Sequence, residues 1–158
     1  MSNQAFTQSG DKFYISTTAA NSDLDDHATL GFPGKTYTEV KMVGSIGEFG
    51  VSTNMVSYDT LGNDVVLKAK GMTNAGDPPI ECAEVFDDPG QIAMRAAGAS
   101  TNKNNYAFKI LRADGQIEYL RGLVAGPVQP GGRNEDFRLL VFTLGLNQTP
   151  LIIAPGDS

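Results

Sequence analysis

Several residue types are scarce in this chain, and each scarcity excludes a class of protein. Tryptophan is absent, and the 158 residues include one cysteine, Cys82, and one histidine, His27. A single cysteine excludes an internal disulfide framework, and a single histidine excludes the common histidine-rich zinc sites. The longest strongly apolar run, residues 139–142, is far too short to span a bilayer. No apolar run follows a basic start, so we expect no signal peptide and a protein that is cytosolic at synthesis.

Basic residues are outnumbered by acidic ones. The chain has 12 Lys and Arg against 18 Asp and Glu, which gives a net charge of −6. This balance argues against a broad basic face that grips nucleic acid. Residues 1–90 carry a net charge of −8 and residues 91–158 a net charge of +2. Such a split suits head-to-tail self-association, although an acidic coat that keeps the protein in solution is the simpler explanation.

Eighteen glycines and eight prolines favour turns and short strands over long helices. One helix is predicted over residues 91–97, because Asp88 is a good N-cap, Pro89 suits the first helical position and Gly98 can end the helix. Asp114-Gly115 predicts a hairpin turn. Strands are predicted at residues 12–17, 37–43, 64–70, 80–86, 106–112, 116–124, 135–144 and 152–153. Without a βαβ rhythm, the pattern predicts one mainly β domain, 1–158, a β-sandwich or barrel with one flanking α-helix.

Three segments have no clear period: an N-terminal arm (1–10), expected to be mobile, a long central loop (44–64) and a C-terminal tail (145–158). We interpret the central loop as partly strand-like and expect it to become ordered on contact with a partner. A loop as long as 44–64 is uncommon in a compact domain unless it is functional or disordered, and its apolar residues argue against plain disorder. Exposed apolar segments in an acidic protein often mark partner surfaces. The candidate contact residues between subunits are Ile46, Phe49, Val51, Met55, Val56, Tyr58, Ile152 and Ile153.

A search for catalytic chemistry finds no convincing site. His27 stands beside two aspartates, but the segment lacks the spacing of a calcium loop, and a solvated loop is the favoured interpretation. Residues 43–47 depart from the nucleophile motif G-x-S-x-G, because Val43 replaces the first glycine. Cys82 lies in a predicted strand, where a buried inert thiol is expected. We therefore expect no enzymatic activity, no cofactor and no metal.

Five short motifs occur in a recognisable order in the second half of the chain. They are Ala75-Gly76-Asp77, Asp88-Pro89-Gly90-Gln91 at the start of the helix, Tyr106 to Ile110, Asp114-Gly115 and Tyr119 to Val124. This order resembles that of the major tail tube proteins of long-tailed, lambda-like bacteriophages. The resemblance covers about the last half to two-thirds of the chain.

The resemblance implies a structural virion protein of siphovirus type without enzymatic activity. Six copies would form a hexameric ring with a continuous inner β-barrel, and rings would stack head-to-tail into the tail tube, the conduit for DNA ejection. The implied partners are other copies of the chain, a tape measure protein in the lumen during assembly, tail terminator and distal tail proteins at the ends, and genomic DNA as passing cargo, with no membrane insertion. Assembly would occur in the host cytoplasm and the final location would be the virion tail. Some members carry an extra immunoglobulin-like C-terminal domain, and because this chain ends near Pro150 we expect a bare tube surface.

On this interpretation, segments 1–10, 44–64 and 145–158 are connectors between rings, 44–64 being the inter-ring loop. An acidic lumen would repel phosphate, so DNA would slide instead of sticking. The lumen-facing candidates are Glu39, Asp64, Glu81 and Glu84. Two alternatives stay open: a related ring or tube protein (a tail terminator, a contractile-tail tube or a secretion-system tube), and a monomeric β-sandwich that binds a carbohydrate or a protein. The lack of tryptophan counts against carbohydrate stacking.

Overall fold

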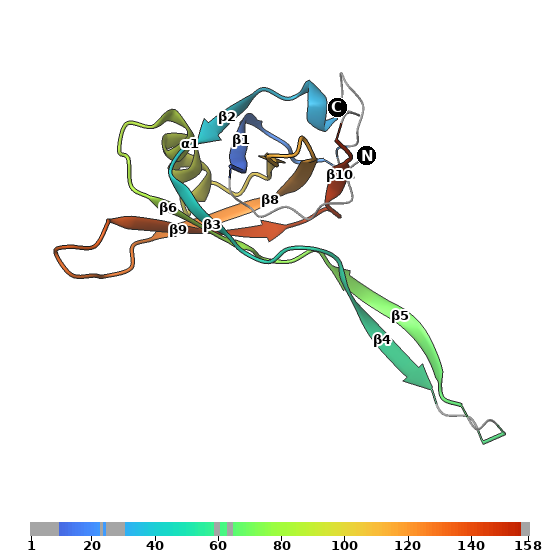
Figure 1. The fold of residues 1–158 in the computed structure, drawn as a ribbon. Helices are drawn as coiled ribbons and strands as arrows, with labels where there is room; N and C mark the ends of the chain where they lie inside the picture. The colour runs from blue at the N-terminus through green and yellow to red at the C-terminus, as the bar shows by residue number, and fades with distance from the viewer. Residues whose placement is uncertain (1–9, 23, 25–30, 59–60, 63–64, 156–158) are drawn as a thin grey trace.

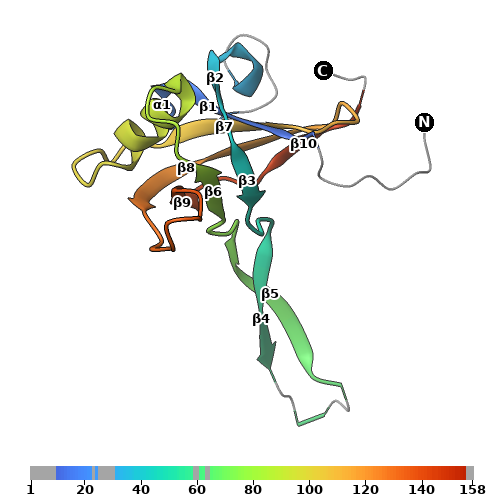
Figure 2. The ribbon, with the colours of Figure 1, turned by 60° about the vertical axis from the view of Figure 1, so that its left-hand side comes forward.

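The structure is a computed structural model that describes residues 10–22, 24, 31–58, 61–62 and 65–155. A β-sandwich with one flanking helix forms the body, and a long two-stranded hairpin projects from it (Figures 1 and 2). The fold is mainly β, as the sequence predicts. The elements within the described ranges are β1 (Lys12–Ala19), the 3₁₀ turn η1 (Phe32–Gly34), β2 (Tyr37–Val40), β3 (Val43–Ile46), β4 (Ser52–Tyr58), β5 (Leu67–Asn74), β6 (Pro79–Ala83), α1 (Pro89–Gly98), β7 (Tyr106–Leu111), β8 (Ile117–Val128), β9 (Leu139–Leu146) and β10 (Leu151–Ile153).

One antiparallel sheet makes both layers of the sandwich, in the order β2-β1-β7-β8-β9-β6-β3, with β10 paired to β8. The long strand β8 belongs to both layers, since residues 117–122 pair with β7 and residues from 122 onward pair with β9. Gly122 lies where β8 changes partner. A Cβ at this position would lie 2.2 Å from the carbonyl oxygen of Gly145, so the close approach of the two strands requires glycine.

The main core lies between the two layers. Buried and half-buried residues alternate along much of β9, which is the pattern of a strand with one face on a core. The rings of Phe13 and Phe108 stack with 5.8 Å between their centroids. Phe142, which comes from the opposite layer, is also fully buried in this core. Each such buried aromatic side chain contributes about 2–3 kcal/mol relative to an exposed one.

A smaller apolar cluster covers the outer face of the β1–β7–β8 layer. Phe32 of η1 stacks on Tyr119 at 5.0 Å, and the hydroxyl of Tyr37 donates to the carbonyl of Phe32 (2.8 Å). This layer is therefore covered on both faces. No described residue forms such a cover on the outer face of the β9–β6–β3 layer, where Thr143 and Ser45 are exposed.

The helix begins as the sequence predicts. The Asp88 side chain accepts a hydrogen bond from the backbone N–H of Gln91 (3.1 Å), and Pro89 occupies the first turn. Met94 and Ala97 face the main core. Gly98 is the last helical residue instead of the residue after the helix, a difference of one position.

The segment predicted as a loop over 44–64 contains most of two strands. β3 ends at Ile46, and β4 pairs with β5 in a hairpin whose second strand continues to Asn74, beyond the strand predicted at 64–70. Nearly every residue of β4 and β5 is exposed. Because neither face packs on the core, the sequence lacks the apolar alternation that marks a strand.

Three other strand boundaries differ from the prediction. The strand expected at 37–43 divides into β2 and β3 at Met42, whose φ of 63° is in the left-handed region. The strand expected from residue 135 begins at Leu139, because a turn closes from Asp136 N–H to the Arg133 carbonyl (3.0 Å). The strand expected over 80–86 ends at Ala83. Within the described ranges, no helix combines the length and apolar character needed to cross a membrane.

Candidate assembly surfaces

The hairpin presents an apolar face that its own chain leaves uncovered. Tyr58 lies opposite Leu67 and Val56 opposite Ala69, so these four side chains share one face of the ribbon. Tyr58 is 69% exposed, Val56 57% and Leu67 53%. We call these four residues the hairpin apolar face. Exposed apolar groups gathered in this way are typical of a surface that another molecule covers.

The opposite face of the hairpin is basic. Met55 lies opposite Lys70, and Ser57 lies opposite Lys68. These two lysines are the only charged residues of β4 and β5. The paired strands are therefore positive, although they belong to the acidic half of the sequence.

The root of the hairpin is anchored to the sandwich by backbone contacts. The N–H of Gly50 donates to the Ala75 carbonyl (3.1 Å), and the N–H of Gly47 donates to the Pro79 carbonyl (2.7 Å). A Cβ on Gly47 would lie 2.2 Å from the Pro79 ring, so glycine is needed for the chain to pass there. The direction of the hairpin is thus set by the body.

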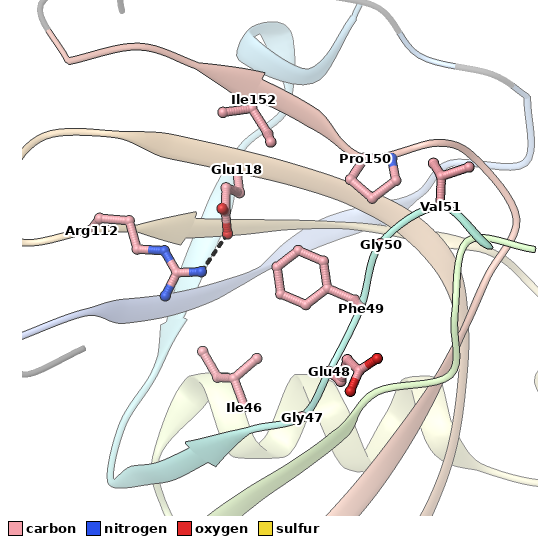
Figure 3. Close-up of a pocket in the computed structure, with 10 residues that line it drawn as sticks. All are labelled: Ile46, Gly47, Glu48, Phe49, Gly50, Val51, Arg112, Glu118, Pro150 and Ile152. Carbon is pink, nitrogen blue, oxygen red and sulfur yellow. Dashed lines mark hydrogen bonds and ion pairs between the residues drawn. The ribbon is translucent and has the colours of Figure 1, made fainter. Parts of the chain in front are cut away.

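A cavity of about 530 Å³ opens beside this root (Figure 3). It continues the space between the two layers, since Ile46 and Phe49 on one wall also pack against the main core. Val51, Pro150 and Ile152 complete its apolar lining, as Figure 3 shows. Two segments that are distant in the sequence, 46–51 and 150–152, therefore meet at one site.

The far end of the cavity is charged. Arg112 lies between two carboxylates, with 2.6 Å to Asp11 and 2.6 Å to Glu118. Burial opposes the charge on Arg112, but its hydrogen bonds to Asp11 and Glu118 outweigh this effect, so the pKa of the guanidinium is raised. The three groups together carry a net charge of −1, and the exposed Glu48 adds another carboxylate to the lining.

The predicted contact residues divide into two groups. Half of them line the cavity: Ile46, Phe49, Val51 and Ile152. Val56 and Tyr58 lie on the hairpin apolar face, and Met55 lies on the opposite face. Ile153 belongs to neither group and packs against the small apolar cluster.

Of the four predicted lumen carboxylates, the three that the structure describes do not share one surface. Glu81 is half-buried on the uncovered face of β6, in register with Ser45 and Val141. Glu39 lies on the outer face of the opposite layer, in register with Tyr14. Asp64 lies outside the described residues.

Glu84 is neutralised by two arginines. Its carboxylate lies 3.4 Å from Arg95 and 3.1 Å from Arg138, and its side chain is 12% exposed. These contacts tie the end of β6 to α1 and to the β8–β9 loop. Glu84 therefore has a structural role that its position in the sequence did not indicate.

Sequence reasoning also missed two exposed phenylalanines. Phe86 is 78% exposed and Phe137 is 82% exposed, and the Arg95 guanidinium lies 5.1 Å from the centre of the Phe86 ring. Both phenylalanines stand in short polar loops without any period, so only their exposure in the folded chain reveals them.

The other residues considered for catalysis or metal binding give little support for either. Cys82 is fully buried, and burial raises the pKa of its thiol to about 11, so the thiol is protonated and inert near neutral pH. Among the residues that the structure describes, no three metal-ligating side chains converge. His27 and its neighbours Asp25 and Asp26 lie outside those residues.

The fold as a whole was compared with those of known proteins. Neither the protein-family models nor the curated proteins give a match to the sequence. Solved structures with a similar fold are found. A chain from the PVC sheath/tube terminator of an extracellular contractile injection system has a TM-score of 0.64 and 10% identity, covering 96% of this chain and 99% of that chain.

Two further structures agree. A chain from the sixfold-symmetrised baseplate of the anti-feeding prophage has a TM-score of 0.58 and 15% identity, with 99% of each chain covered. A chain from the PVC sheath–tube complex in its extended state has a TM-score of 0.57 and 11% identity, covering 90% of this chain and 88% of that one. At such identities the likeness establishes the fold. These structures are contractile systems, whereas the sequence motifs resemble lambda-like tail tubes.

Proposed function

We propose that this protein is a structural, non-enzymatic subunit that forms rings and stacks into a tube of a phage-tail-like particle. Within that class we favour a contractile injection system over the tube of a long-tailed phage. The fold likeness to terminator, sheath–tube and baseplate chains supports this preference. We expect six copies in each ring, since one of the similar chains comes from a sixfold-symmetrised assembly.

The observation that carries the proposal is the uncovered hairpin. A two-stranded ribbon is at best marginally stable alone, yet this one extends away from the body with Tyr58, Val56 and Leu67 exposed. A contact between this hairpin and a different surface of another copy is heterologous, and heterologous contacts close into rings or continue into filaments. Repeated assembly therefore gives the hairpin the cover that it lacks.

The uncovered sheet face provides the second element of the proposal. In a ring, the β9–β6–β3 layers of adjacent copies would line the channel, with Glu81 as a carboxylate on this face. The carboxylate of the exposed Asp77 lies beside Gly145 on the same face, which also presents neutral side chains such as Ser45 and Thr143. A lining of this kind gives a polyanion little to bind, which suits passage of DNA or of a tape measure protein.

A tail terminator is the second candidate function, because a terminator complex is among the similar structures. A terminator would stop as single rings, whereas a tube subunit would grow without limit. Terminator and distal proteins at the ends of the tube are the partners that this proposal adds.

Negative-stain electron microscopy of the purified protein, alone and in particles, tests the proposal. Tubes of stacked rings are expected, and single rings would favour the terminator. A sheath around the tube in particles would support the contractile system, and a bare tube would support the long-tailed phage. A protein that stays monomeric at high concentration would contradict the proposal and favour the isolated binding module.

A further inference from the structure

The hairpin apolar face cannot contact the cavity beside the hairpin's root within one chain. Val51 lines the cavity, and β4 starts at the next residue and runs away from the body (Figures 1 and 2). The hydrogen bond from Gly50 to Ala75 joins the two arms at their base, and the N–H of Leu146 in β9 donates to the Gly76 carbonyl (3.1 Å), which ties this base to the sandwich. Each copy therefore offers an exposed apolar ribbon and, separately, an open apolar cavity.

The two surfaces match in apolar character and size. The cavity walls are formed by Ile46, Phe49 and Ile152, and Ile152 is 59% exposed. A volume of about 530 Å³ is in the range that encloses a drug-sized ligand, so it can take a few large side chains but not a domain. The hairpin apolar face supplies a set of that size in Tyr58, Leu67 and Val56.

The strands that carry the hairpin apolar face are opposite in charge to the cavity, although their lysines lie on the other face of the ribbon. Lys68 and Lys70 make the hairpin strands positive, whereas Glu48 and the group around Arg112 make the cavity negative. Both strands of a two-stranded ribbon are edge strands, so each lysine lies at an edge of the ribbon. Its long side chain can extend around that edge toward the rim of a cavity that holds the opposite face. Complementary charge would orient the encounter and oppose wrong pairings.

We propose that the hairpin apolar face of one copy docks into this cavity of a neighbouring copy. The proposal rests on the proposed function and names the receiving site for the hairpin. It assigns opposite roles to residues that the sequence grouped together: Val56 and Tyr58 are inserted, while Phe49 and Ile152 receive them. Each copy then donates one hairpin and receives another, which is the condition for continued assembly.

Site-specific cross-linking tests the docking. A Tyr58→Cys protein is mixed with an Ile152→Cys protein and treated with a short bis-maleimide, so that any Tyr58→Cys to Ile152→Cys link joins two chains. Both positions are exposed, and the native Cys82 is buried. The matched control is Ser57→Cys mixed with Ile152→Cys, because Ser57 is the adjacent residue on the opposite face of the ribbon.

The expected result is at least tenfold more cross-linked dimer from the Tyr58→Cys mixture than from the Ser57→Cys mixture. Each single variant alone reports links between identical positions and gives the background. Equal yields from the two mixtures, or no dimer above background, would overturn the docking.

Electron microscopy of the same mixtures separates this proposal from the proposed function. Rings or tubes without face-dependent cross-linking would overturn only the docking and leave the assembly proposal standing. Absence of rings and tubes for the unmodified protein would contradict the proposed function itself. Face-dependent dimers without larger assemblies would support the docking and contradict the tube.

Discussion

At the scale of single residues, Gln91 holds together three parts of the sandwich. Its side chain is fully buried, and its amide oxygen accepts from the Val85 N–H (2.8 Å). Its amide nitrogen donates to the carbonyls of Lys41 (2.9 Å) and Ala83 (2.8 Å). One side chain thus satisfies backbone groups at the β2–β3 junction, at the end of β6 and before α1.

We predict that Gln91→Leu strongly destabilises the fold. The leucine fills a similar volume but leaves three backbone groups without their partner, and each unsatisfied buried group costs about 1–3 kcal/mol. The expected loss in the free energy of unfolding is therefore about 3 kcal/mol or more, measured by urea denaturation. Ile92→Leu is the control on the same helix, because Ile92 is 51% exposed, and it should change stability by less than about 0.5 kcal/mol. Equal midpoints for the two variants would contradict the role of Gln91.

The contrast between Asp88 and Gln91 shows what a sequence can reveal about single residues. The Asp88 cap joins residues three positions apart, so local chemistry is sufficient to predict it. Gln91 reads only as a good helix former, because one of its partners, Lys41, is 50 positions away. The same limit applies to Glu84, whose neutralising partners become neighbours only after folding.

At the scale of elements, the sequence predicts most of those that touch the core and misses the pairing of the two strands that do not. The β7–β8 hairpin follows from its Asp114-Gly115 turn, where Gly115 has a φ of 97°. β4 and β5 were not recognised as a pair, because a ribbon exposed on both faces needs no apolar alternation. The cavity likewise could not be foreseen as a site, although four of the residues that line it had been named.

We predict that the β4–β5 hairpin is needed for assembly and not for folding. Replacing residues 52–74 by Asn-Gly should be tolerated, because Gly50 and Ala75 already lie within hydrogen-bond distance and Asn-Gly forms a tight hairpin turn. The residues removed bury little against the sandwich, so the free energy of unfolding should change by about 1 kcal/mol or less. Urea denaturation and electron microscopy of the same sample measure both effects.

The control for this excision is the removal of residues 44–64, the loop that the sequence suggests. That deletion removes most of β3, which pairs with β6 through Ser45 and Ile46, and leaves β5 without a partner. It should impair folding as well as assembly. Tubes formed by the 52–74 replacement would contradict the role of the hairpin as a connector.

At the scale of the whole molecule, the acidic and basic halves of the sequence do not form two separate ends of the folded protein. β1 pairs with both β2 and β7, and β6 pairs with β9, so the acidic and basic halves of the sequence are interleaved in one sheet. The hairpin strands, from the acidic half, are positive. Complementarity between copies must therefore come from local surfaces, and the hairpin and the cavity supply such a pair.

The whole-molecule arrangement also narrows the choice of lumen residues. Glu39 and Glu81 lie on the outer faces of opposite layers, so one channel lined by a single layer cannot expose both. Glu84 is already paired with two arginines. Of the described candidates, Glu81 alone lies on the outer face of the β9–β6–β3 layer, and for this reason the lumen proposal rests on Glu81.

We predict that Glu81→Lys converts a non-binding channel into one that retains DNA. Each subunit changes by two charge units on the channel face, and lysine–phosphate contacts bind DNA with a strong dependence on salt. The long lysine stem can keep its ammonium group in water, so assembly should be preserved. Tubes assembled with short duplex DNA and treated with nuclease should protect several-fold more DNA than unmodified tubes, and the protection should fall as salt is raised. Glu135→Lys makes the same charge change in the exposed β8–β9 loop, and equal protection by both variants would remove Glu81 from the lumen.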